Sequence, residues 1–217
     1  MDKDSQTKLK VTELEKDVGV HFSTDLKFDA HIDYIVKKAN QLVGIIKRSF
    51  SHLDKENFVN LYKTIIRPHL EYANVIWHPM LKRQKLAIEA VQRRATKIVP
   101  EMRNLSYPDR LKYLNLPSIK YRQLRGDLIQ TYKIIHNIDN INSHDFFTLS
   151  TYESTRNSTL KLFKQHAKSN TRRNFLSYRV NSLWNALTET TRIAENLLMF
   201  KKGLDNELYE MKYIHYE

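Results

Sequence analysis

Apolar residues recur at helical spacing through most of the chain, and only four glycines and five prolines interrupt the pattern. Three stretches place their apolar residues on one side of a helical wheel. They run from Phe28 to Phe50, from Phe58 to Ile66 and from Lys82 to Val99. Pro68 follows the second stretch, and its ring denies the preceding turn a hydrogen bond, so we expect that helix to break or kink there. The chain is therefore predicted to be largely helical.

Shorter elements complete the prediction. Alternating apolar and polar residues from Val11 to Phe22, with Gly19 among them, indicate a short β-hairpin. Ser106 and Ser118 stand where N-caps are expected, so each is predicted to begin a helix. Residues 138–155 are polar and lack a period, which is typical of a linker. A last helix is expected over residues 194–211.

The segment from Ser154 to Thr188 contains no Asp or Glu but seven basic residues. They are Arg156, Lys161, Lys164, Lys168, Arg172, Arg173 and Arg179. We expect this segment to start extended and to end in a helix whose buried side chains run from Phe175 to Leu187.

We therefore predict a mainly α fold: a helical bundle preceded by a short N-terminal β-hairpin and followed by a basic C-terminal segment of mixed extended and helical structure. Four regions are expected. They are a hairpin over residues 1–22, a helical domain over 23–104, a helical connection and linker over 105–150 and a basic helical region over 151–217.

Charge points to an anionic partner. Lys and Arg outnumber Asp and Glu by 36 to 24 in 217 residues, which gives a formal net charge of +12. There is no cysteine, which fits a reducing compartment. The polar opening MDKDSQTKLK is no signal peptide, and no eighteen consecutive apolar residues occur. We expect an intracellular protein, nuclear or cytoplasmic, that is neither secreted nor bound to a membrane.

The motifs that carry chemistry are absent from the sequence. It has no glycine-rich nucleotide loop, no G-x-S-x-G elbow, no H-E-x-x-H motif and no adjacent pair of aspartates. His69 and His78 lack the spacing of metal ligands and are interpreted as packed or exposed side chains. Trp77 and Trp184 are expected in the core. No catalytic residue, metal site or cofactor is predicted.

Clustered arginines and lysines are the candidate binding residues, because the guanidinium fork suits phosphate. A charged helical face is more often only solvated, but here a single acid, Glu89, interrupts the first cluster. The nucleic-acid-binding candidates are Lys82, Arg83, Lys85, Arg93, Arg94, Lys97, Arg122, Arg125, Arg172, Arg173 and Arg179.

Several blocks between Lys10 and Asp205 also resemble, in order and spacing, the C-terminal part of reverse transcriptases of jockey-like non-LTR retrotransposons. They include LYKTIIRPHLEYANVIWHP, AIEAVQRRATKIV, RLKYLNLPSIKYRQLRGDLIQTYKIIH and RRNFLSYRVNSLWNAL. The chain departs from the family at Leu187-Thr188, where Leu-Pro is usual.

The resemblance implies a polymerase thumb that grips a template–primer duplex of RNA and DNA. The hairpin would correspond to the last palm strands, and residues 28–99 to the thumb. The palm of the family holds Mg²⁺ through carboxylates that include a Y-x-D-D box, and that box is not in this chain. The resemblance therefore implies a catalytically incomplete fragment of an RNA-directed DNA polymerase.

Two alternatives stay open at this point. The chain could be a helical module that binds protein, or that associates with itself through faces left uncovered by the missing palm. It could also be an independent enzyme, although no residue pattern supports a site.

Overall fold

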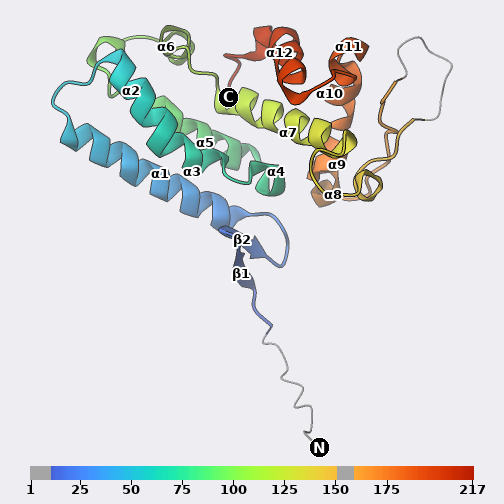
Figure 1. Cartoon of the computed structure of the whole chain (residues 1–217). Helices are drawn as coiled ribbons and strands as arrows, with labels where there is room; N and C mark the ends of the chain where they lie inside the picture. Colours follow the sequence, from blue (N-terminus) through green and yellow to red (C-terminus); the bar gives the residue numbers. More distant parts are fainter. Residues whose placement is uncertain (1–10, 151–158) are drawn as a thin grey trace, which may run out of the picture.

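The computed structural model describes residues 11–150 and 159–217, and it confirms the mainly helical fold with an N-terminal hairpin (Figure 1). Arg156 and part of the expected linker lie outside the described residues. The strands and longer helices are β1 Leu14–Asp17, β2 Val20–Ser23, α1 Asp29–Ser49, α2 Lys55–Leu61, α5 Lys82–Ala95, α6 Tyr107–Leu114, α7 Ile119–Ile135 and α12 Leu197–Glu207. The short helices are α3 Arg67–Glu71, α4 Asn74–Trp77, α8 Asn170–Asn174, α9 Leu176–Arg179, α10 Asn181–Ala186 and α11 Glu189–Arg192.

The hairpin is antiparallel, with Asp17 opposite Val20 at its turn. Val18 and Gly19 both have positive φ, 42° and 81°, as a two-residue turn with the twist of the strands requires. Tyr72 holds this turn from the neighbouring helical region, since its hydroxyl donates to the Val18 carbonyl oxygen at 3.0 Å. A Cβ at position 19 would lie 3.3 Å from the Tyr72 ring, so glycine suits both the φ angle and the close contact.

Apolar side chains between Val20 and Ile119 form one hydrophobic cluster, which we call the N-terminal core. Helix α1 contributes the periodic set Ile32, Ile35, Ala39, Val43 and Ile46, all buried. Trp77 is fully buried in the same cluster, as predicted. Helices α3 and α5 both pack on α1, so this region is a small bundle of helices.

The chain passes Pro68 without a break. Residues 62–66 form a π-helical turn, in which the Arg67 N–H donates to the Tyr62 carbonyl, and α3 continues directly from it. A wider turn accommodates the ring and the missing N–H of a proline. The break or kink predicted near this residue is thus replaced by a local change of helix type.

Two predicted helix starts are confirmed by their N-caps. The Ser106 hydroxyl accepts from the Asp109 N–H, at the start of α6, and the Ser118 hydroxyl accepts from the Tyr121 N–H, at the start of α7. Each bond satisfies one of the free N–H groups of a first helical turn.

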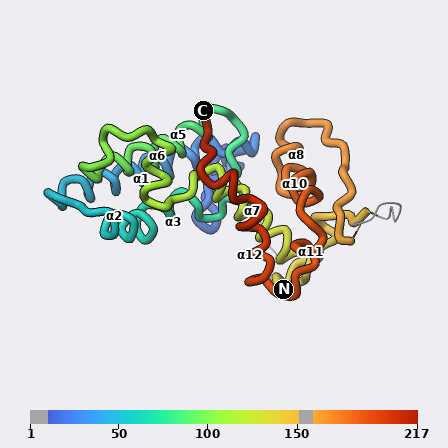
Figure 2. The backbone as a smooth tube through the Cα atoms, turned by 90° about the horizontal axis from the view of Figure 1, so that it is seen from above, coloured from blue at the N-terminus to red at the C-terminus, as the bar shows by residue number. Residues whose placement is uncertain are grey.

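The apolar side chains between Tyr121 and Leu208 form a second cluster, which we call the C-terminal core. Trp184 lies at its centre, fully buried, and Tyr132 stacks on Phe200 with ring centroids 4.2 Å apart. Helix α7 spans the two cores, which lie to either side of it (Figures 1 and 2).

The prediction of a single helix from Phe175 to Leu187 is wrong. The structure has three short helices there, α8, α9 and α10, because Phe175 adopts an extended conformation with ψ 147° and ends the first of them. Phe175 and Leu183 are 44% and 36% exposed, so they are not the buried residues expected.

The extended start of this segment agrees with the isolated bridge between Leu149 and Leu162. The last helix is shorter than expected, and residues 209–211 form a separate 3-10 turn. Thr188 caps α11 by accepting from the Thr191 N–H, at the position where the resembled family usually has proline. No helix in the described parts of the chain has the length and apolar character needed to cross a bilayer.

Candidate nucleic-acid interface

A basic groove lies between α1 and the C-terminal end of α5, with a volume of about 550 Å³. Its lining residues are Asn40, Val43, Gly44, Lys47, Arg94, Lys97, Ile98 and Arg103. Four of these eight are cationic and none is acidic. We call these four residues together, Lys47, Arg94, Lys97 and Arg103, the groove cations.

Helical spacing sets this groove. Asn40, Gly44 and Lys47 follow one another at intervals of four and three residues, so they share a face of α1. The Arg94 guanidinium donates to the Asn40 side-chain oxygen, which orients it from α5 across to α1. Beside it, an Arg48 Nη1 atom lies 3.4 Å from where a Gly44 side chain would begin. The groove therefore lies between α1 and the end of α5, with Val43 and Gly44 in its lining.

Two groove cations lie beyond the end of α5. The helix ends at Ala95, and Thr96 closes it by donating its hydroxyl to the Arg93 carbonyl oxygen. Lys97 follows directly, and Arg103 follows the 3-10 turn Pro100–Met102. These two side chains thus approach the groove from irregular backbone, which helical periodicity cannot place.

The groove cations have few partners of their own. Within the described residues, none of Lys47, Lys97 and Arg103 takes part in an ion pair. Cations that share a face without acidic neighbours produce a local positive potential. That potential favours an anion with several charges, such as a phosphate backbone.

The structure brings only two of the predicted candidates, Arg94 and Lys97, into this groove. Arg93 is exposed nearby, but its guanidinium lies over the Tyr107 ring, 5.0 Å from the centroid. Lys47 and Arg103 were not among the candidates. Lys47 lies on α1 and Arg103 follows the 3-10 turn, and nothing in the sequence places either of them beside the end of α5.

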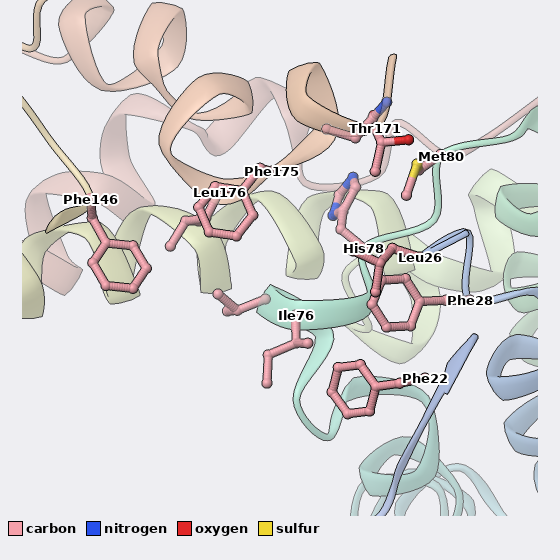
Figure 3. Close-up of a pocket in the computed structure, with 12 residues that line it drawn as sticks. Phe22, Leu26, Phe28, Ile76, His78, Met80, Phe146, Thr171, Phe175 and Leu176 are labelled. Atoms are coloured by element: carbon pink, nitrogen blue, oxygen red, sulfur yellow. The ribbon is translucent and has the colours of Figure 1, made fainter. Parts of the chain in front are cut away.

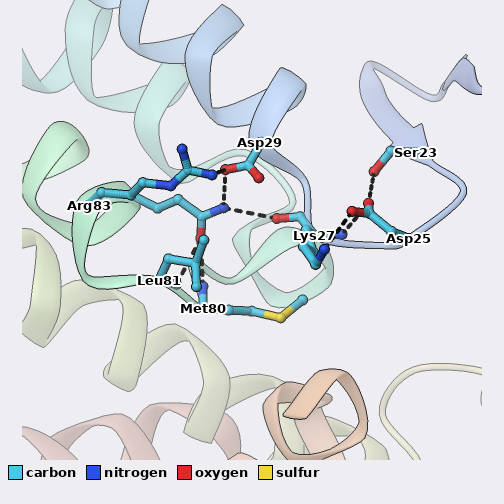
Figure 4. Close-up of polar contacts among 8 residues, drawn as sticks. Ser23, Asp25, Lys27, Asp29, Met80, Leu81 and Arg83 are labelled. Atoms are coloured by element: carbon cyan, nitrogen blue, oxygen red, sulfur yellow. Dashed lines mark hydrogen bonds and ion pairs between the residues drawn. The ribbon is translucent and has the colours of Figure 1, made fainter. Parts of the chain in front are cut away.

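Lys82 and Arg83 lie at the opposite end of α5 from the groove. Lys82 is exposed, and Arg83 donates to the Asp29 carboxylate at 2.8 Å (Figure 4). Gln84 links the same two segments, because its amide donates to the Lys27 carbonyl and to Asp29. This end of α5 is therefore occupied in joining α5 to the start of α1.

Lys85 points away from the groove. Nine residues separate Lys85 from Arg94, which at 100° per residue puts the two on opposite sides of the helix, about 180° apart. Lys85 is one of the nucleic-acid-binding candidates from the sequence. In the structure Lys85 is half-buried and lies 5.7 Å from the centroid of the Tyr216 ring.

Three candidate arginines make ion pairs inside the protein. Arg122 binds Glu71 with two nitrogens, and Arg125 binds Asp205 in the same way at 2.5 and 2.9 Å. Arg179 donates to both oxygens of Asp127, at 2.8 and 2.7 Å, and to two backbone carbonyls. Their guanidinium groups connect elements of the fold, and none of the three arginines lines the basic groove.

Arg172 and Arg173 are exposed on α8, in the other region of the molecule. Arg172 lies over the rings of Phe175 and Tyr178, with its guanidinium carbon 5.5 and 4.9 Å from their centroids. The eleven candidates therefore do not form one surface.

A metal site is not apparent in the part of the chain that the structure describes, where no three His, Asp or Glu side chains gather as possible ligands. The chain matches no protein-family model, and comparison with curated proteins and with solved structures finds no similar protein.

Proposed function

We propose that this chain binds nucleic acid through its phosphate backbone, without sequence specificity, at the basic groove. The observation that supports this most strongly is the convergence of four cations from α1, α5 and the turn after it, with no acid in the lining. Phosphate contacts made by Lys and Arg supply affinity and no direct sequence readout.

The resemblance to the thumb of non-LTR retrotransposon reverse transcriptases supports a more specific proposal about the kind of protein and its ligand. The thumb-like part, residues 28–99, contains α1 and α5, the two helices that wall the groove. We infer a catalytically incomplete fragment of an RNA-directed DNA polymerase that holds a duplex of RNA and DNA in the nucleus or cytoplasm. Mg²⁺ would belong to palm residues that this sequence lacks.

Binding is tested by fluorescence anisotropy with a labelled RNA–DNA hybrid at low salt. The double variant Arg94→Gln/Lys97→Gln removes two groove cations, and we expect its affinity to fall about 10-fold or more. Lys201→Gln/Lys202→Gln on α12 is the matched control, since it removes the same charge in the other region. Equal affinity of the two double variants would contradict the proposal.

The expected lack of polymerase activity has its own test. Purified protein is supplied with Mg²⁺, deoxynucleotides and a primed RNA template, and extension of the primer is followed on a gel. We expect no extension. Extension that persists through purification would contradict the inference that the chain is catalytically incomplete.

A second candidate function rests on an apolar pocket of about 340 Å³ between the hairpin, α4 and the segment around α8 and α9 (Figure 3). Apolar side chains dominate its lining, and Phe22, Phe28, Phe146 and Phe175 are among them. Exposed apolar hollows of this kind often bind another protein. The alternative function is thus a helical module for protein binding or self-association.

Sedimentation of the protein over a 100-fold concentration range separates the two functions. A mass that rises with concentration, together with no affinity for the hybrid, would favour the association module. A constant monomer mass with salt-dependent binding would favour the nucleic-acid function. The variant Phe175→Ser is informative here, because Phe175 is 44% exposed and its loss weakens association more than folding.

A further inference from the structure

A second pocket, of about 250 Å³, lies on the side of α5 away from the basic groove. It is enclosed by α5, α7, the start of α10 and the C-terminal residues. Its lining includes Lys85 from α5, Lys120 from the first turn of α7, and Tyr216, beside the polar side chains of His78, Asp127 and Arg179. We call it the paired-lysine pocket.

The two lysines converge on one aromatic ring. Their Nζ atoms lie 5.7 and 5.8 Å from the centroid of Tyr216, whose hydroxyl donates to Gln123 at 2.9 Å and is held in place. Neither lysine has an ion-pair partner within the described residues. Two like charges therefore lie near the same ring, and both line the same pocket.

Two of the nearby carboxylates are engaged elsewhere. Asp127, in the lining of the pocket, accepts from two nitrogens of the Arg179 guanidinium. Glu89 accepts from the Tyr107 hydroxyl and from the backbone N–H groups of Ile119 and Lys120. His78 also lines the pocket, and burial lowers its pKa to about 3, so it is neutral at pH 7. The pocket thus carries a net charge near +2 from its two lysines.

Such an arrangement is costly for the protein alone. Burial lowers the pKa of Lys85, and the charge of Lys120 lowers it further. A cation held half-buried beside another loses hydration without gaining a partner. An anion between the two ammonium groups would offset both the lost hydration and the repulsion between the two cations.

We propose that the paired-lysine pocket binds a small oxyanion, such as inorganic phosphate or a terminal phosphate monoester, between Lys85 and Lys120. The ammonium groups donate to its oxygens, and the Arg179–Asp127 ion pair lies in the same lining. This site is independent of the basic groove, because Lys85 and Arg94 lie on opposite sides of α5, and it holds whether or not the groove binds nucleic acid.

The test is a titration of the full chain with inorganic phosphate at constant ionic strength, followed by amide chemical shifts in NMR spectra. We expect saturable shifts at Lys120 and Tyr216. Lys85→Gln and Lys120→Gln should each weaken phosphate binding about 10-fold, since each removes one charge-assisted donor. Lys38→Gln, an exposed lysine on α1, should leave it unchanged.

Absence of saturable shifts in folded wild-type protein would overturn the proposal, and so would unchanged affinity in both pocket variants. Each variant is checked by its far-UV circular dichroism, so a loss of binding is not mistaken for unfolding.

A second arm identifies the source of the phosphate. A dinucleotide is compared with and without a 5′-phosphate, in competition with inorganic phosphate. Tighter binding of the phosphorylated form, lost in Lys120→Gln but kept in Arg94→Gln/Lys97→Gln, would support the end of a nucleic acid as the ligand. Equal affinity for the phosphorylated dinucleotide and free phosphate would support a free oxyanion in the same pocket.

Discussion

The two cores of this protein are built differently. The N-terminal core is filled by apolar side chains from long helices, with α1 spanning 21 residues and α5 14. The C-terminal core combines α7 and α12 with helices of four to six residues, tied together by buried polar groups. Arg192 is 1% exposed and donates to the carbonyls of Thr159 and Leu187. Buried polar groups also bond in the N-terminal region, where Glu89 accepts from the Tyr107 hydroxyl and Arg110 donates to Thr96. The two cores therefore differ in the length of their helices more than in their use of buried hydrogen bonds.

The largest effect is expected from Asp127→Ala. This change leaves Arg179 buried and unpaired in the C-terminal region, where its side chain is only 11% exposed. Removing one partner of a buried ion pair costs about 3 to 5 kcal/mol of unfolding free energy. Urea unfolding, followed by tryptophan fluorescence, measures the loss.

Arg83→Ala is the matched control in the N-terminal region. Arg83 and Asp29 are also an ion pair, but their side chains are 70% and 39% exposed. Its loss should cost less than about 1 kcal/mol, because solvent screens exposed pairs. Similar losses in the two variants would contradict the view that burial decides how much an ion pair contributes to stability in this protein.

A smaller effect should appear with pH in the N-terminal region. His31 is 1% exposed beneath the hairpin, and burial, followed by the charge of His21, lowers its pKa from 6.5 to about 4. The unfolded chain therefore takes up a proton between pH 6.5 and 4 that the folded chain does not, and stability falls as the pH falls through that window. From pH 7 to pH 5 the loss is about 2 kcal/mol.

The variant His31→Gln isolates this contribution. Its urea midpoint should change less between pH 7 and pH 5 than that of the wild type. His78→Gln serves as a comparison at the boundary of the C-terminal region, since the pKa of His78 is also lowered by burial. A wild-type pH dependence in His31→Gln would show that His31 is not responsible.

The smallest effects come from two glycines in helices. A Cβ at Gly203 in α12 would lie 2.6 Å from the Thr191 hydroxyl oxygen, so Gly203→Ala should destabilise by about 1 kcal/mol after its gain in helix propensity. A Cβ at Gly44 in α1 meets only the flexible end of Arg48, so Gly44→Ala should stabilise by up to about 1 kcal/mol. Thermal unfolding shows whether each variant is more or less stable than the wild type. A change in the same direction for both variants would contradict this comparison of the two glycines.

The difference in helix length between the two cores explains which elements could be predicted from the sequence. Helix α1 and its buried face from Ile32 to Ile46 follow from apolar periodicity, and Ser106 and Ser118 mark their helix starts. The region around Phe175 could not be predicted this way. Arg179, the last residue of α9, donates to the Val75 carbonyl, and such a bond between distant segments cannot be read from apolar periodicity.

The interface was predictable only in part, for a related reason. Arg94 and Lys97 stand out in the sequence as charges close together. Lys47 and Arg103 join them only because α1 packs on α5, which is a tertiary contact. In the sequence, Arg122, Arg125 and Arg179 look like the other candidate cations. Their acidic partners, Glu71, Asp205 and Asp127, lie 51 or more residues away along the chain.

The most direct test of the nucleic-acid function is the salt dependence of hybrid binding. The logarithm of the association constant should fall linearly with the logarithm of salt concentration, with a slope of about −0.9 for each phosphate neutralised. In Arg94→Gln/Lys97→Gln the slope should become shallower by about 2, while Lys201→Gln/Lys202→Gln keeps the wild-type slope. A slope that is the same in the groove variant and the wild type would contradict binding at the basic groove.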